Sequence, residues 1–156
     1  FMITFITRMT AIKENATVFL YLYFILVFMT DSGAWFFGVL FGKSTRGFFK
    51  ASPNKSIVGF FGGIITAIAC GILFKLIFPT IFFGSIWKIV LLSFATALAA
   101  IIGDLIESVF KRSLGVKDSG TIIPGRGGLL DCLDSLILGA PIFYIGVHFL
   151  YLIAKS

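Results

Sequence analysis

The sequence has few charged residues. Only 13% of its 156 residues are Asp, Glu, Lys or Arg, whereas a soluble domain carries about 25%. Apolar residues make up 58% of the chain and include 20 Phe. One small core cannot bury them all, because a folded chain of this length leaves about a third of its surface exposed. The composition therefore excludes an ordinary soluble domain and predicts a protein that faces lipid.

Other absences narrow the class further. Two cysteines, Cys70 and Cys132, are too few for a disulfide framework or a zinc site, so we expect two unpaired thiols. The net charge is +6, but no soluble basic face or stacking platform accompanies it, and we expect no nucleic-acid partner. Residues 1–30 lack a small-residue cleavage site and are not interpreted as a signal peptide. Because the chain begins at Phe1, we interpret it as part of a longer protein.

Four segments reach the ~20 mainly apolar residues that a helix needs to cross a bilayer. They are residues 16–41, which Asp31 and Ser32 interrupt, and residues 57–78, 85–110 and 129–154. Residues 1–14 are interpreted as part of an earlier helix. The glycines of "GFFGG" (59–63) are expected to allow close helix approach. The predicted fold class is all-α, a polytopic transmembrane helical bundle with about four membrane helices, and residues 1–156 form one membrane-embedded unit.

The basic residues predict the orientation of this bundle. Residues 79–84 form a short link between the second and third segments, so the connections 42–56 and 112–128 lie on the same face. Together with Lys111, those connections contain 8 of the 13 Lys and Arg residues. The positive-inside rule makes that face cytoplasmic. We expect an integral membrane protein, in the cell (inner) membrane of its source, with the face that carries these two connections toward the cytoplasm.

The acidic residues need a different explanation. All except Glu14 lie in or toward the cytoplasmic half of the chain, and several lie inside apolar segments. A carboxylate at that depth costs a few kcal/mol, so it normally faces a partner or a wet cavity. The acids in question are Asp31, Asp104, Glu107, Asp118, Asp131 and Asp134.

The third segment carries a polar stripe. Asp104, Glu107, Ser108 and Lys111 stand at i, i+3, i+4 and i+7, which places them on one side of a helix. A Glu107–Lys111 pair at a helix end would account for two of them. Such a pair does not account for Asp104, which adds a carboxylate deeper in the membrane.

The fourth segment opens with a matching set. Asp131, Asp134 and Ser135 stand at i, i+3 and i+4. Acids suit a helix N-terminus, where the macrodipole favours negative charge. Two helices nevertheless present carboxylates at similar depth on the same side, and Mg²⁺ accepts oxygen ligands of this kind together with substrate phosphates. The two faces predict Asp104, Asp131 and Asp134 as metal ligands.

Between these helices lies a glycine-rich turn, Gly125–Gly128. Its glycines let the backbone approach a ligand, and a helix N-terminus attracts phosphate. Bases for phosphate oxygens beside acids for a metal are what nucleotidyl transfer requires. The candidate phosphate-binding bases are Lys55, Lys111, Arg112, Lys117 and Arg126.

The run "SVFKRSLGVKDSGTIIPGRGGLLDCLDS" (108–135) resembles the signature of the CDP-diacylglycerol synthases, also called phosphatidate cytidylyltransferases. The matched positions are Ser108, Lys111, Arg112, Lys117, Asp118, Gly120, Pro124, Gly125, Gly127, Gly128, Asp131, Asp134 and Ser135. "GDLIES" (103–108), "SPNKS" (52–56) and "DSGAWFFGVLFGK" (31–43) fall where the family has comparable stretches. The resemblance covers nearly the whole chain as the C-terminal portion of such an enzyme.

The resemblance implies a reaction of CTP with phosphatidate that gives CDP-diacylglycerol and pyrophosphate, with Mg²⁺ as cofactor and a second cation as an option. It also implies a homodimer as one possible assembly. The candidate catalytic residues are Asp104, Glu107, Lys111, Asp131 and Asp134, with Glu107 orienting Lys111 or a metal-bound water. The candidate substrate-binding residues are Lys55, Ser108, Arg112, Lys117, Asp118, Gly127 and Gly128.

Two positions depart from the family pattern. Arg126 stands in place of a histidine, and Cys132 stands in place of an arginine. A degenerate homologue that binds CTP without turnover is therefore a competing hypothesis. Two further hypotheses are a CTP-dependent lipid kinase and, from another class of protein, a cation or proton transporter.

Overall fold

The computed structural model describes residues 4–12, 15–47, 52–53, 55–116 and 129–153, with the backbone alone for residues 129–133. Every element named in this part is helical. The elements are α1 (Thr4–Thr10), α2 (Ala16–Phe41), the short 3₁₀ turn η1 (Lys43–Thr45), α3 (Ile57–Ile77), α4 (Ile86–Ser113), α5 (Leu129–Val147) and the π-helical turn η2 (His148–Leu152).

The described residues contain four helices that are long and apolar enough to cross a membrane. They are α2, α3, α4 and the continuous stretch Asp134–Leu152 of α5 and η2. The predicted fold class is confirmed, and the chain is an integral membrane protein. In lipid, a helix satisfies its own backbone hydrogen bonds, which is why apolar segments of this length form helices.

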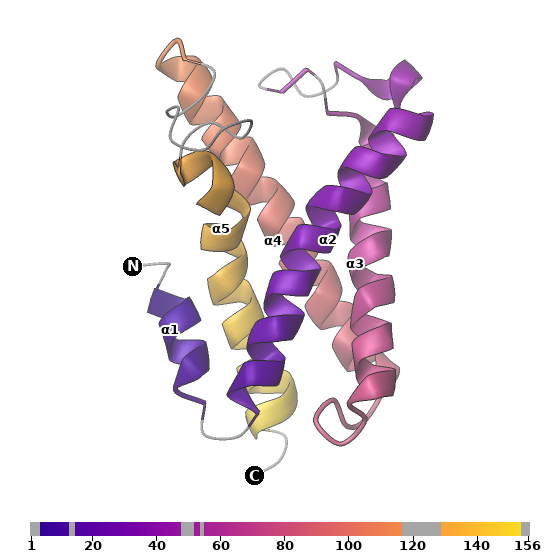
Figure 1. The fold of residues 1–156 in the computed structure, drawn as a ribbon, viewed down its shortest axis with the longest axis vertical. Helices are drawn as coiled ribbons and strands as arrows, with labels where there is room; N and C mark the ends of the chain where they lie inside the picture. The colour runs from indigo at the N-terminus through magenta and orange to yellow at the C-terminus, as the bar shows by residue number, and fades with distance from the viewer. Residues whose placement is uncertain (1–3, 13–14, 48–51, 54, 117–128, 154–156) are drawn as a thin grey trace.

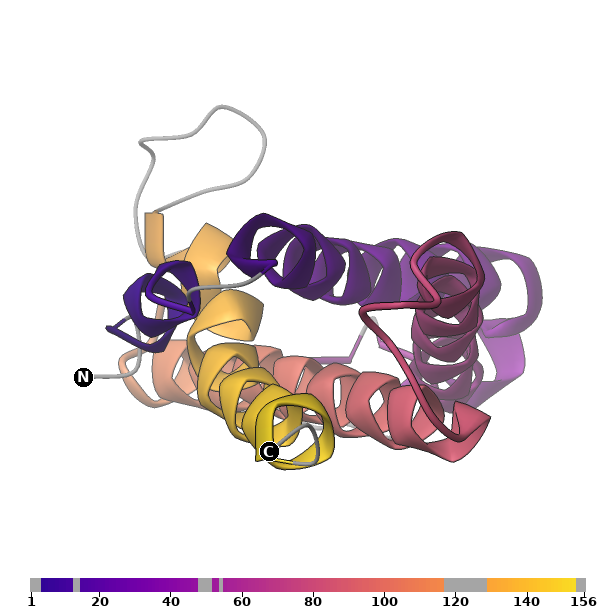
Figure 2. The same cartoon turned by 90° about the horizontal axis from the view of Figure 1, so that it is seen from below.

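The helices pack as two pairs, α2 with α3 and α4 with α5. At one end of the molecule, the upper end in Figure 1, the two pairs lie apart, and lower down α4 passes behind α2. Viewed from below, α2 and α4 form two layers with α3 at one side and α5 with α1 at the other (Figure 2). The end of α2, the start of α3, the end of α4 and the start of α5 all lie at the upper end, as the short α3–α4 link predicted. We call it the polar end.

Glycines determine how closely α2 and α3 approach. A Cβ atom added at Gly59 would lie 2.5 Å from the carbonyl oxygen of Ala34, and one at Gly63 would lie 2.6 Å from that of Thr30. No side chain fits at such distances, so the two backbones touch as they do at small-residue contacts between membrane helices. The expectation from "GFFGG" is confirmed.

The structure confirms one predicted segment and corrects the ends of two others. The first segment is confirmed, since α2 has the predicted bounds and runs through the polar residues Asp31 and Ser32 as one helix. Helix α4 continues past residue 110 to Ser113, whose hydroxyl donates to the carbonyl of Phe110 (2.8 Å). The last helix changes to π-helical turns at His148 rather than continuing as an α-helix to 154. Within residues 1–14, the described residues form helix α1 (Thr4–Thr10), and its continuation into an earlier helix stays a prediction.

A buried polar contact ties the two pairs together. The Tyr23 hydroxyl on α2 is fully buried and donates to the carbonyl of Leu136 on α5. The Tyr23 ring also packs against Phe143, with ring centroids 5.4 Å apart. Because this carbonyl is two residues from Asp134, the contact fixes the start of α5 against α2 close to the acidic residues.

Candidate active site

The polar stripe on α4 faces the inside of the bundle. Glu107 is only 7% exposed, and Asp104, Ser108 and Lys111 are half-buried. The residues between them, Ile106, Val109 and Phe110, are exposed on the outer side of the helix. The helical spacing in the sequence therefore predicted the inward face correctly.

Three carboxylates meet at the junction of α4 and α5. Asp104 and Glu107 from α4 and Asp134 from α5 each place a carboxylate oxygen within 4.8 Å of the other two. We call this group the carboxylate trio. Gly103 makes it possible, because a Cβ atom there would lie 2.7 Å from the carbonyl oxygen of Asp134. The absence of a side chain at Gly103 lets the two helices approach where the acids meet.

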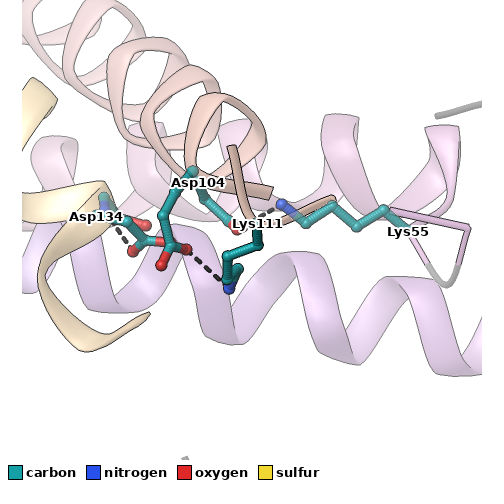
Figure 3. A network of polar contacts seen from close by, with 6 residues as sticks. Lys55, Asp104, Lys111 and Asp134 are labelled. Atoms are coloured by element: carbon teal, nitrogen blue, oxygen red, sulfur yellow. Dashed lines mark hydrogen bonds and ion pairs between the residues drawn. The ribbon is translucent and has the colours of Figure 1, made fainter. Parts of the chain in front are cut away.

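Two lysines reach the trio from different elements. Lys55, in the α2–α3 connection two residues before α3, forms an ion pair with Asp104. Lys111, one turn along α4, lies 3.0 Å from a carboxylate oxygen of Glu107. Figure 3 shows Asp104 between Lys55 on one side and Asp134 on the other. The Glu107–Lys111 pair was expected from the i, i+4 spacing, whereas the pairing of Lys55 with Asp104 joins residues 49 positions apart and was not.

The donor set suits a divalent cation. Carboxylate oxygens are the hard ligands that Mg²⁺ prefers. Apart from the ion pair with Lys111, neither buried oxygen of Glu107 accepts a hydrogen bond with acceptable geometry from the described residues. Among the described residues, two lysines form ion pairs with the three carboxylates, so a metal ion would offset the repulsion that remains within this set. The trio can therefore bind a metal ion.

The trio differs in one member from the predicted ligand set. The structure brings Glu107 together with Asp104 and Asp134, whereas the sequence assigned Glu107 an orienting role. The signal was present, because Glu107 stands three residues after Asp104 on the same helical face. Asp131 belongs to the first turn of α5, three residues before Asp134, but its side chain lies outside the described residues.

The structure describes only two of the remaining predicted site residues. Ser108 is half-buried on the polar stripe, and Arg112 is exposed in the last turn of α4. The other predicted residues of the connection lie outside the described part of the chain, as does the side chain of Cys132. They are Lys117, Asp118, Gly125, Arg126, Gly127 and Gly128.

A cavity of about 570 Å³ lies between α2, α3 and α4 and reaches Asp104. Its lining includes two charged residues to which the sequence assigned no site role, Asp31 on α2 and Arg46 after η1. A single antiparallel bridge between Arg46 and Ser56 folds the α2–α3 connection back on itself. The backbone N–H of Gly47 also donates to the carbonyl of Pro53 (3.0 Å). This fold brings Arg46 beside the start of α3, where Lys55 lies.

Comparisons with known proteins agree with the resemblance in the sequence. A family model described as the cytidylyltransferase family matches residues 1–150. Proteins named phosphatidate cytidylyltransferase match from Haemophilus influenzae (46% identity; 81% of this chain, 44% of the relative), Staphylococcus epidermidis (42%; 78% and 46%) and Helicobacter pylori (39%; 88% and 50%). The chain spans about half the length of the curated relatives it matches. Because the family model covers nearly all of the sequence, the chain belongs to the cytidylyltransferase family.

Proposed function

We propose that this chain holds the reaction centre of a phosphatidate cytidylyltransferase, which converts CTP and phosphatidate into CDP-diacylglycerol and pyrophosphate. The observation that carries the proposal is the carboxylate trio with Lys55 and Lys111 at the polar end of a membrane bundle. The relatives' shared name supports the choice of substrates. A lipid substrate and a nucleotide can meet only where the membrane adjoins water, and a polar site near the ends of the helices suits that need.

The reaction needs little acid–base chemistry from the protein. An oxygen of the lipid phosphate forms a bond to the α-phosphorus of CTP, the bond between the α- and β-phosphates breaks, and its electron pair leaves with pyrophosphate. The attacking phosphate is already ionised, so no strong general base is required. Positioning the two anions and neutralising their charge should supply most of the rate enhancement.

Asp104, Glu107 and Asp134, with Asp131 on the first turn of α5, would hold the Mg²⁺ that neutralises charge on the triphosphate. A second cation at this site stays a prediction. Lys111 is held against Glu107, so its ammonium group is oriented at the edge of the trio.

The signature residues complete the proposed nucleotide site. We assign them to the CTP phosphates and the departing pyrophosphate, because bases and glycines there precede the N-terminus of α5. They are Ser108, Lys111, Arg112, Lys117, Asp118, Gly127 and Gly128. The proposed orientation places this end at the cytoplasmic face of the cell (inner) membrane, where CTP is present. The homodimer and the absence of a nucleic-acid partner also stay predictions.

The test is an assay of the full-length protein in detergent with CTP and phosphatidate, with and without Mg²⁺. The proposal expects CDP-diacylglycerol and pyrophosphate only when Mg²⁺ is present. Phosphorylation of a lipid alcohol would instead indicate the lipid kinase, and ion flux in liposomes without CTP would indicate the transporter.

The degenerate homologue has its own test. If the wild-type protein binds CTP without turnover, Arg126→His combined with Cys132→Arg should create activity. Turnover by the wild-type protein would exclude this hypothesis.

A further inference from the structure

Tyr23 places a hydroxyl group inside the bundle, against the backbone of α5. Its side chain is fully buried, and the hydroxyl donates a hydrogen bond to the carbonyl of Leu136. The ring packs against Phe143, two turns further along α5, with the ring planes at 48°. Phenylalanine would fill the same space without a buried polar atom, and the chain contains 20 Phe but only 4 Tyr. The hydroxyl itself therefore needs an explanation.

The turn of α5 that carries Asp134 is held from two sides. On α4, a Cβ atom at Gly103 would lie 2.7 Å from the carbonyl oxygen of Asp134, so the two backbones touch. On α2, Tyr23 binds the carbonyl of Leu136, two residues later. Within the turn, Oδ1 of Asp134 accepts a hydrogen bond from the backbone N–H of Ser135 (2.5 Å). The Asp134 carboxylate is thus attached to the backbone of its own turn and moves when that turn moves.

Pro141 weakens α5 just after this turn. Proline has no N–H to donate to the carbonyl of Ile137, four residues earlier, and its ring pushes that carbonyl aside. Sharp bends of helices occur most often at such positions. Inside a membrane, groups of a neighbouring helix compensate for the lost hydrogen bond. The Tyr23 hydroxyl does so at the adjacent carbonyl, that of Leu136, where α5 is least able to hold its own shape.

We propose that Tyr23 is a positioning residue, whose hydrogen bond to α5 keeps the Asp134 carboxylate beside Asp104 and Glu107. The inference rests on the proposed function for the role of the carboxylate trio as a metal site. The oxygens of the trio lie within 4.8 Å of one another, and three carboxylates repel at that distance before a cation binds. A movement of the Asp134 turn at Pro141 would relieve the repulsion and take the site apart. The contact from α2 limits this movement.

Tyr23→Phe in the full-length protein tests the position of α5. The substitution removes one oxygen atom and keeps the ring, so the variant should fold. Amide hydrogen exchange, measured by mass spectrometry in detergent without divalent cations, should become faster in residues 134–140 and stay the same in α3. Exchange in residues 134–140 that matches the wild-type protein would overturn the proposal.

Tyr151→Phe is the matched control. Tyr151 is 1% exposed, and its hydroxyl has no hydrogen-bond partner among the described residues, so the substitution removes the same atom without removing a contact. Exchange in residues 134–140 should therefore stay at the wild-type rate in this variant. Faster exchange in both variants would assign the effect to the loss of any buried hydroxyl and would overturn the specific role of Tyr23.

Binding of Mn²⁺ by the full-length protein, followed by electron paramagnetic resonance without substrate, tests the consequence for the metal site. The Kd for Mn²⁺ should rise about tenfold in Tyr23→Phe, as expected when a group that orients a metal ligand is lost, and stay unchanged in Tyr151→Phe. A lower Tm with an unchanged Kd would show that the hydroxyl only stabilises the fold, which would overturn the proposal. If the wild-type protein binds no Mn²⁺, the metal assignment of the proposed function fails, and the exchange measurement alone decides whether Tyr23 positions Asp134.

Pro141→Ala tests the weak point of α5. Alanine returns an N–H for the carbonyl of Ile137, so α5 regains a complete hydrogen-bond ladder. Tyr23→Phe should then raise the Kd for Mn²⁺ and the exchange rate of residues 134–140 less than it does with Pro141 present. Equal effects of Tyr23→Phe in the two backgrounds would overturn the role of Pro141.

Discussion

Glu107 is the residue whose surroundings most need an explanation. It is the most buried member of the carboxylate trio, and Lys111 forms an ion pair with it from the next turn of α4. An ionised group at this depth needs more compensation than a single lysine at the helix end gives. A bound cation would provide it, which makes Glu107 a ligand as well as an anchor for Lys111.

We therefore predict that Glu107→Gln raises the Mg²⁺ concentration for half-maximal activity about 10- to 100-fold. The amide keeps the shape of the side chain but loses its charge. The measurement is a Mg²⁺ titration of CDP-diacylglycerol formation, with Ser113→Ala at the exposed end of the same helix as control. An unchanged titration curve with lower maximal activity would show that Glu107 orients Lys111 and does not bind the metal.

The second prediction at the scale of residues concerns Asp131. It stands one turn before Asp134 on α5, and its role comes from the sequence. Asp131→Asn should abolish turnover in the full-length protein. Near-normal, Mg²⁺-dependent activity of this variant would remove Asp131 from the site.

At the scale of the elements, close helix contacts bring the acids together. Gly103 lets α4 touch the backbone of α5 at Asp134, and the same kind of contact joins α2 to α3 at Gly59 and Gly63. Helical spacing alone predicted the polar stripe of α4, because one period of 3.6 residues fixes which side chains share a face. Matching depth on two segments predicted that Asp104 meets Asp134, whereas the ion pair of Asp104 with Lys55 came only with the structure, because no helical spacing links residues of separate elements.

Gly103→Ala should lower activity by separating α4 from α5. The added Cβ atom would lie 2.7 Å from the Asp134 carbonyl oxygen and 3.1 Å from the Leu138 Cβ, and overpacking of this kind costs about 1–3 kcal/mol. We expect turnover to fall more than thermal stability. Ile102→Ala, at the neighbouring exposed position, should leave both nearly unchanged. A Gly103→Ala variant with full activity would show that the trio tolerates the shift.

The whole molecule is two helix pairs that lie apart at the polar end (Figure 1). Hydropathy predicted the four spanning segments, and the short α3–α4 link predicted which ends share a face. The cavity between the pairs was not predictable, because it depends on how the pairs cross and on the bridge from Arg46 to Ser56. A contact between residues ten positions apart in an irregular connection leaves no periodic signal in the sequence.

The orientation gives a prediction at this scale. In a background of Cys70→Ala and Cys132→Ala, Ser44→Cys should react with a membrane-impermeant thiol reagent only from the cytoplasmic side. Thr80→Cys, exposed in the α3–α4 link, should react only from the opposite side. The reverse pattern of labelling would invert the topology that the basic residues predict.

The central claim is that the carboxylate trio supports Mg²⁺-dependent transfer of a cytidylyl group to a lipid phosphate. The most direct measurement is CDP-diacylglycerol formation from labelled CTP and phosphatidate by the full-length protein and by Asp104→Asn, each with and without Mg²⁺. The account predicts product from the wild-type protein only with Mg²⁺ and almost none from the variant. Equal product without Mg²⁺, or near wild-type product from Asp104→Asn, would contradict it.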